Sequence, residues 1–269
     1  KKLKWIADLR DPWTDIYYYH LLSHSFISKR IDAKYERNVV EACDVLLTLG
    51  ETFKQTFLSK TTLPIEDKVV LIPNGYDPEN FEDIKLDPPN NSVYTITHTG
   101  TMADTYEPDI FFLAVKRLIE QFPEDVIELK MVGSVSTGVK TLISEHIGIK
   151  TEFTPPVSHP EAITLMCNAD LLFLATPGVA GPVPGKIFEY LAANKPIIGV
   201  GKGDTAKVLV ETNSGRSFNR DESEEIFEYL KELYTNFKQG ISFSPNADKV
   251  KSFSCAEQAI KMSEVIFDI

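Results

Sequence analysis

Short apolar runs alternate with amphipathic segments along the whole chain. The run "DVLLTL" (44–49) precedes "GETFKQTFLSK" (50–60), which has helical spacing, and a further apolar run, "KVVLIP" (68–73), follows. "KWIADL" (4–9) has the same apolar character. Short apolar runs bounded by turn residues are typical of buried strands, and a period of about 3.6 residues predicts helices. The first 90 residues therefore predict a β-α-β series.

The same alternation restarts after the segment 74–92, which is rich in Pro, Asn and Asp. Because helices of this length connect the strands, the pattern predicts a parallel sheet with both faces covered. We expect strands at 93–100, 126–133, 149–154, 170–175 and 196–201, and helices at 108–122, 139–148, 158–169, 186–193 and 204–213.

The two units differ in completeness. Residues 93–250 supply enough strands for a doubly wound domain, whereas the first 90 residues supply about half of a Rossmann-like domain of ~100–150 residues. The fold class predicted is therefore α/β, with two Rossmann-like parallel-sheet domains of which the first is incomplete in this chain. The chain also begins with Lys1 instead of Met, and we expect it to be a piece of a longer protein.

Net charge, cysteine spacing and the length of apolar runs argue against several classes of function. The chain has 269 residues, a net charge of −11 and a pI near 5.0, which argues against sequence-independent binding of nucleic acid. Its three cysteines are far apart and lack C-x-x-C spacing, so that neither a disulfide framework nor a zinc site is predicted. No stretch approaches the roughly 20 apolar residues of a membrane-spanning helix.

Four of the expected strands end in polar or glycine-bearing loops. Ligands of open parallel sheets bind beyond the carboxyl ends of the strands, and Gly100 and Gly133 stand where a missing Cβ would let the backbone approach a ligand. Each glycine alone could equally make only a turn. Together the loops predict an anion or nucleotide site, although neither the phosphate-loop nor the dinucleotide-binding glycine pattern is present. The loops are 97–102, 131–138, 153–160 and 175–186.

The segment "PGKIFEYLAANKPIIGVG" (184–201) carries the most specific chemistry. Asn194 is suited to end its helix in the left-handed conformation. We expect the backbone N–H groups of residues 184–187 to face the ligand, with Lys186 beside them and Glu189 one turn further on. The pair could hold the phosphates and ribose of a sugar nucleotide, or it could be a surface ion pair three residues apart. The spacing favours neither interpretation.

Beyond the strand at 4–9, Asp8, Arg10 and Asp11 are candidates for the acceptor side of a cleft between the domains. An Arg–Asp pair that only holds the loop in place is an equal alternative.

An ordered set of motifs resembles the retaining GT-B glycosyltransferases of family 4, of the bacterial polysaccharide-assembling type. Residues 184–201 resemble their donor-site helix, and the other four motifs follow the order that the family has. These are "WIADLRDPW" (5–13) in the acceptor domain, "VVLIPNGYD" (69–77) at its end, and "ITHTGTM" (96–102) and "ELKMVGSV" (128–135) in the donor domain. The resemblance implies an acceptor domain at residues 1–90, a donor domain at 91–252 and a C-terminal helix at 253–269 that returns to the first domain.

The resemblance also assigns roles. It implies that Glu189 binds the ribose hydroxyls of the donor, that Gly100 and Thr101 lie beside its diphosphate, and that Pro156 and Val157 edge its nucleobase. The other expected donor-binding residues are Gly133, Gly185 and Lys186, and Lys186 is also the catalytic candidate. One departure is Gly181, which stands where the family has a glutamate that contacts the sugar.

The implied activity is transfer of a sugar, with retained anomeric configuration, from a UDP- or GDP-linked donor to a saccharide or lipid-linked acceptor in cell-surface polysaccharide synthesis. Neither a metal nor a cofactor is expected, nor a nucleic-acid partner. The expected location is the cytoplasm, with peripheral association at the inner face of the plasma membrane as an option. Two alternatives are a sugar-nucleotide 2-epimerase and a catalytically silent module that binds nucleotide sugars.

Overall fold

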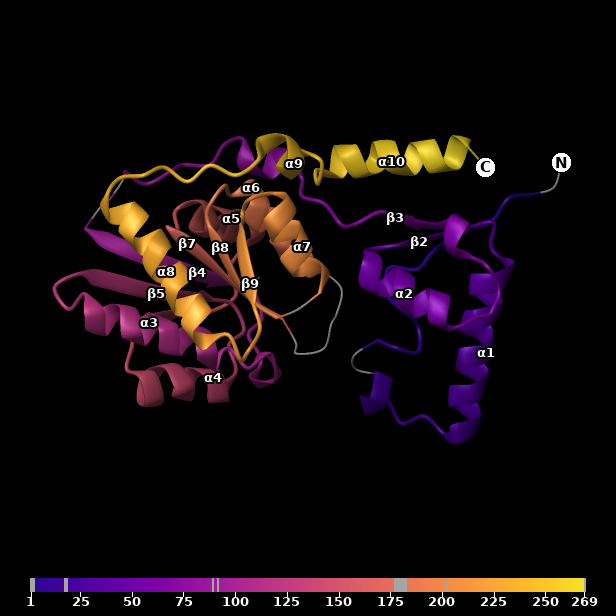
Figure 1. Ribbon diagram of the computed structural model, residues 1–269, viewed down its shortest axis with the longest axis horizontal. Coiled ribbons are helices and arrows are strands. Elements are labelled where there is room, and N and C mark those ends of the chain that lie inside the picture. Colours follow the sequence, from indigo (N-terminus) through magenta and orange to yellow (C-terminus); the bar gives the residue numbers. More distant parts are fainter. Residues whose placement is uncertain are drawn as a thin grey trace.

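The computed structural model describes residues 3–16, 19–88, 90, 92–176, 183–201 and 203–268. These residues form two parallel sheets with helices around them (Figure 1). One sheet has the strand order β1-β2-β3, and the other has the order β6-β5-β4-β7-β8-β9. In the second sheet the order reverses between β4 and β7, as in a doubly wound fold. The predicted α/β class is therefore confirmed.

The N-terminal half is built on the three-stranded sheet. Its core gathers Val40, Leu46, Phe53 and Phe57, which are almost completely shielded from solvent. The elements are β1 (Ile6–Asp8), α1 (Phe26–Ala42), β2 (Val45–Thr48), α2 (Glu51–Ser59) and β3 (Val69–Leu71).

The six-stranded sheet is covered on both faces, because side chains along a strand alternate between the faces. Leu171 and Phe173 of β7 pack with α3 and α8, and Phe173 stacks on Phe111 of α3 at a ring-centroid distance of 3.7 Å. Leu172 and Leu174 pack with α5, α6 and α7. The strands are β4 (Val93–Thr99), β5 (Val126–Val132), β6 (Thr151–Thr154), β7 (Leu171–Ala175), β8 (Ile197–Val200) and β9 (Gly215–Phe218). The helices are α3 (Asp109–Gln121), α4 (Thr137–Thr141), α5 (His159–Cys167), α6 (Lys186–Ala192), α7 (Asp204–Glu211), α8 (Ser223–Lys238), α9 (Ala247–Lys251) and α10 (Cys255–Phe267).

The helix expected at 139–148 differs from the prediction. It begins at Thr137 and continues after α4 as a π-helical turn over Leu142–Ile147, which ends at Gly148 with a φ of +75°. The elements α1, β9, α8 and α9 are additions to those predicted. None of the helices in the described part of the chain is both long and apolar enough to span a membrane.

The chain passes between the two halves twice at one place. The Tyr76 N–H donates to the Phe253 carbonyl (3.1 Å), and the Cys255 N–H donates to the Tyr76 carbonyl (2.8 Å). A Cβ on Gly75 would lie 2.7 Å from the Phe253 oxygen, so that only glycine fits at this crossing. From here α10 runs back beside the three-stranded sheet (Figure 1). Val265 of α10 and Leu71 of β3 line one cavity. The domain boundaries at residues 90 and 252 stay predictions.

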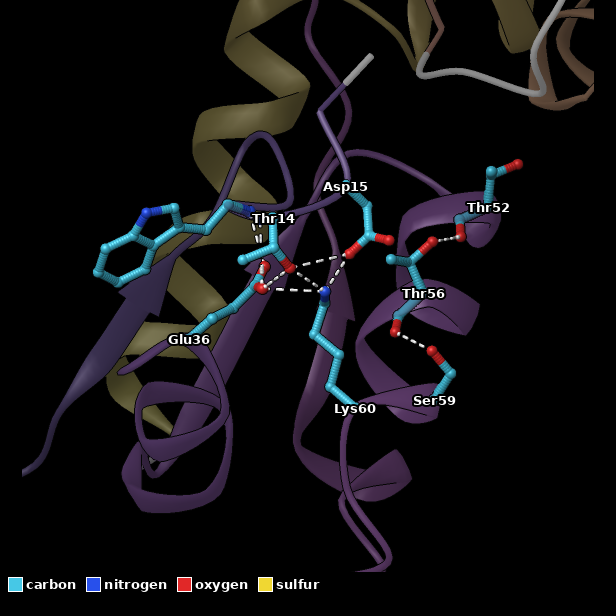
Figure 2. Close-up of polar contacts among 8 residues, drawn as sticks. Thr14, Asp15, Glu36, Thr52, Thr56, Ser59 and Lys60 are labelled. Carbon is cyan, nitrogen blue, oxygen red and sulfur yellow. Dashed lines mark hydrogen bonds and ion pairs between the residues drawn. The ribbon is translucent and has the colours of Figure 1, made fainter. Parts of the chain in front are cut away.

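A buried carboxylate holds the loop that follows β1. Glu36 of α1 is completely buried and accepts from the backbone N–H groups of Trp13 (2.6 Å) and Thr14 (3.3 Å) and from the Thr14 hydroxyl (Figure 2). The Lys60 ammonium, which is 13% exposed, lies 2.9 Å from Glu36 and also pairs with the exposed carboxylate of Asp15. Glu36 thereby joins the β1 loop to α1 and to the end of α2.

We expect Glu36→Ala to lower the free energy of unfolding by about 3–5 kcal/mol, because it leaves the mostly buried Lys60 ammonium and two backbone N–H groups without their acceptor. Asp15→Ala is the matched control, since it removes the exposed partner of the same lysine and should cost less than about 1 kcal/mol. Urea denaturation measures both values. Equal losses in the two variants would contradict the role given to Glu36.

Candidate functional site

The site is built at the reversal of strand order. β4 pairs with β5 as far as Thr99, but it pairs with β7 only at Ile96 and Thr97. Buried side chains fill the space where β4 and β7 separate. The Nδ1 atom of His98 lies 2.9 Å from the Phe173 carbonyl oxygen, and the Tyr190 hydroxyl accepts from the Thr99 N–H (2.9 Å). Ligands of doubly wound sheets bind in the crevice beyond such a reversal.

Burial keeps both of these side chains neutral. It lowers the pKa of His98 to about 3, an effect that the nearby Lys186 ammonium reinforces. It raises the pKa of Tyr190 to about 12, although hydrogen bonds with Thr99 act in the opposite direction. The floor of the site therefore has no ionised His98 or Tyr190 at neutral pH.

Lys186 places an ammonium group at the same strand end. It is the first residue of α6, and its Nζ donates to the Thr99 carbonyl oxygen at 3.0 Å. Both backbone polar groups of Thr99 are thus bound by side chains of α6, since Tyr190 binds the N–H. Burial lowers the pKa of Lys186 from its ordinary 10.5 to about 8, against the raising influence of Glu189. The ammonium is therefore held among groups that only partly compensate its charge.

Gly100 and Gly133, two of the predicted site residues, follow the ends of β4 and β5 at this edge of the sheet. Gly100 has a φ of +100°, and a Cβ on it would lie 3.0 Å from the Lys186 Nζ atom. Gly133 has a φ of +122°, and a Cβ on it would lie 2.3 Å from the Gly100 carbonyl oxygen. The two turns thus lie against each other and against Lys186, with Thr101 exposed immediately beyond. The structure brings these predicted residues together, and their ligand contacts stay predictions.

Glu189 contacts a residue that the sequence analysis did not single out. Its Oε1 atom lies 2.7 Å from Nε2 of His159, the first residue of α5. Pro156 and Val157 lead from β6 into this helix, with Pro156 exposed and Val157 half-buried. The predicted nucleobase segment and the predicted ribose-binding carboxylate are therefore adjacent. The available signal was the place of His159, the first helical residue after a strand end at the ligand edge.

The Lys186–Glu189 surface ion pair is not the arrangement found, since Lys186 binds the Thr99 carbonyl and Glu189 binds His159. The expected row of N–H groups at the start of α6 also needs correction. Pro184 has no N–H, and the Ile187 N–H donates to the Pro184 carbonyl (3.0 Å). The exposed Gly185 and the half-buried Lys186 keep the amides that could face a ligand. Gly181 lies outside the described residues.

Two of the three acceptor-side candidates are linked to this helix start. Arg10 pairs with Asp8 (3.1 Å), as the loop-holding alternative proposed, and its guanidinium also donates to the Asn74 side chain (3.3 Å). The amide nitrogen of Asn74 lies 4.0 Å from where a Cβ on Gly185 would stand. Arg10 is therefore linked through Asn74 to the start of α6, and Asp8 is linked to it through Arg10. Asp11 is exposed in the loop that follows.

We expect the stability of the protein to rise with pH between about 8 and 10.5 through Lys186. In this window the unfolded chain binds a proton at Lys186 that the folded chain has released, because the folded pKa is the lower one. Lys186→Met should remove this part of the slope, and Lys251→Met, at an exposed lysine, should keep it. Chemical denaturation at several pH values measures the slopes. An unchanged slope in Lys186→Met would contradict the environment described for this lysine.

We also expect Gly133→Ala to destabilise the fold by more than Gly148→Ala. Both glycines have positive φ, for which an alanine costs about 1–2 kcal/mol. Only Gly133 has a neighbour, the Gly100 carbonyl, within the reach of a new Cβ, whereas Gly148 has open space. Thermal denaturation of the two variants separates the cost of a positive φ, which both share, from the cost of the collision, which only Gly133→Ala has. Equal losses would mean that the two glycine turns are not in contact.

Solved structures of other proteins have a fold similar to that of this chain. HepE (Alr3699) of Anabaena, solved with UDP-glucose, has a TM-score of 0.71 to this chain at 15% sequence identity, over 98% of this chain and 72% of that one. Sucrose-phosphate synthase of Thermosynechococcus elongatus has a TM-score of 0.70 at 12% identity, over 100% and 68%. WaaG, a glycosyltransferase involved in lipopolysaccharide biosynthesis, has a TM-score of 0.62 at 18% identity, over 92% and 73%.

No curated protein matched the sequence. The likeness to the solved structures concerns the fold alone, and it confirms the GT-B arrangement. A family model described as "Glycosyl transferases group 1" matches residues 93–236, which is more than half of the chain and includes Lys186 and Glu189. The chain therefore belongs to the glycosyl transferases group 1 family.

Proposed function

We propose that this glycosyltransferase moves a sugar from a nucleoside-diphosphate donor to a saccharide or lipid-linked acceptor with retention of the anomeric configuration. The observation that carries the proposal is the docking of α6 on the end of β4. It sets Lys186 beside the Gly100 turn and Glu189 beside the segment that follows β6. A cation beside a glycine turn suits a diphosphate, and a carboxylate one helical turn away suits a pair of ribose hydroxyls.

In this proposal each residue acts on one part of the donor. The carboxylate of Glu189 accepts hydrogen bonds from the ribose, and Pro156 and Val157 border the nucleobase. Gly100, Thr101 and Gly133 leave space for the diphosphate, while Gly185 and Lys186 donate to its oxygens. When the bond between the sugar and the diphosphate breaks, negative charge grows on the leaving oxygen. A preorganised ammonium stabilises that charge more in the transition state than in the bound donor.

The finer parts of the proposal have separate support. HepE has been solved with UDP-glucose and with UDP, which supports a UDP-linked donor, with a GDP-linked donor as the other expected class. WaaG takes part in lipopolysaccharide biosynthesis, which supports a role in cell-surface polysaccharide assembly. We place the reaction in the cytoplasm, at or near the inner face of the plasma membrane, and we expect it to need no metal. Asp8, Arg10 and Asp11 are proposed to face the acceptor.

We expect Glu189→Gln to weaken UDP or GDP binding about 10- to 100-fold, because a charged hydrogen-bond acceptor for the ribose is lost. Calorimetry with the nucleotide and with its 2′,3′-dideoxy analogue tests the contact directly. The dideoxy analogue should bind the parent and the Glu189→Gln variant alike. Glu161→Gln, at an exposed carboxylate in the first turn of α5, is the control and should bind as the parent does. A loss of equal size for both ligands would assign Glu189 to another contact.

Turnover decides between the enzyme and its two alternatives. A retaining transferase incubated with a UDP- or GDP-sugar and an acceptor saccharide yields a product whose anomeric configuration, read by NMR, equals that of the donor, with EDTA having no effect. An epimerase would instead change the configuration at C2 of the donor sugar. A binding module would bind the nucleotide and leave the donor intact.

A further inference from the structure

Helix α2 of the N-terminal half begins without a cap of its own. Gly50, at the N-cap position, has no side chain to accept from the first N–H groups of the helix. The N–H of Thr52 donates instead to the Asp204 Oδ2 atom at 2.8 Å. Asp204 belongs to the six-stranded half and lies 152 residues further along the chain. A carboxylate of one half therefore caps a helix of the other.

The local structure around Asp204 presents its carboxylate to α2. Asp204 is the first residue of α7, and the preceding Gly203 has a φ of +101°, which turns the chain out of β8 into the helix. The residue is 6% exposed. Its other carboxylate oxygen lies 3.4 Å from the Lys207 ammonium on the same helix. Asp204 is thus buried between two helix N-termini, each of which favours a negative charge.

Gly50 lies against this carboxylate and has no side chain that would collide with it. A Cβ on Gly50 would lie 2.5 Å from the Asp204 Oδ2 atom, and the three nearest atoms that it would meet all belong to the Asp204 side chain. The φ of Gly50 is −170°, which is extended backbone that any residue can adopt. The need for glycine here therefore comes from Asp204 and not from the backbone.

The contact complements the crossing at Tyr76 and Phe253. At the crossing, two backbone hydrogen bonds tie the segment after β3 to the segment before α10. The start of α7 meets the start of α2 at a separate place, where the two halves of the molecule face each other (Figure 1). A crossing of two extended segments resists separation of the halves but permits rotation about it. A second contact, away from the crossing, prevents that rotation.

We infer that Asp204 is a positioning residue that sets the orientation of the two halves by capping α2 of the other half. Gly50, which has no Cβ, leaves the space that the Asp204 carboxylate occupies. This inference goes beyond the proposed function and does not depend on it. For a transfer reaction it means that the alignment of Asp8 and Arg10 with the start of α6 is set by a contact outside the donor site.

The test uses a distance between spin labels in the two halves. Labels at Asn38→Cys on α1 and Glu232→Cys on α8, both exposed positions, are introduced in a Cys255→Ser background and measured by pulsed electron paramagnetic resonance. Asp204→Ala and Gly50→Ala should each broaden or shift the distance distribution relative to the labelled parent. Asp204→Asn keeps an oxygen that can accept from Thr52 and should restore most of the parent distribution. Lys207→Ala, which removes the other partner of Asp204, should leave it unchanged.

The double variant Asp204→Ala/Gly50→Ala distinguishes the loss of this one contact from a general loss of structure. In Asp204→Ala the obstacle to a Cβ at residue 50 is gone, so that adding Gly50→Ala should change the distribution no further. An additive effect in the double variant would overturn the inference, because Gly50 would then matter for a reason other than Asp204. Unchanged distributions in both single variants, with normal folding by circular dichroism, would overturn it as well.

Discussion

The six-stranded half depends on how the backbone polar groups of Thr99, the last residue of β4, find hydrogen-bond partners. Thr99 lies where β4 has already separated from β7, so that its N–H and carbonyl on that side have no strand partner. Both are bound by side chains of α6, namely the Tyr190 hydroxyl and the Lys186 ammonium. Buried backbone polar groups must be paired, and here the requirement fixes the position of a helix. Because Glu189 is on the same helix, its place beside α5 follows from that constraint.

This arrangement explains why Lys186 is both structural and chemically available. Its bond to a carbonyl oxygen holds the side chain in place, but a carbonyl carries only a partial charge. The ammonium is consequently under-compensated, and burial lowers its pKa. A group in this condition interacts more strongly with an arriving anion than a lysine already paired with a carboxylate would. A Cβ on Gly100 would lie 3.0 Å from the Lys186 Nζ atom, so that the glycine leaves this side of the ammonium open to the diphosphate of the proposed donor.

The architecture was predictable from the sequence because strands such as β7 are buried on both faces and form continuous apolar runs. Strand β9 was not predicted, because it is an edge strand of four residues in which only Phe218 is buried. The strand ends identified Gly100 and Gly133, since parallel strands end at one sheet edge. The contacts of His159 with Glu189 and of Asp204 with Thr52 were not predictable in this way. Each joins residues far apart in the sequence, and no local periodicity records such pairings.

The crossing of Tyr76 with Phe253 and Cys255 has a consequence for the order of events during synthesis. The helix that lies beside the three-stranded sheet, α10, leaves the ribosome long after β3, at a rate of roughly 5–20 residues per second. For on the order of ten seconds or more, the first sheet exists without one of its neighbours, while the six-stranded half acquires all of its strands. A nascent chain at this stage exposes sheet surface that α10 later covers, and such transiently exposed surface is prone to aggregate.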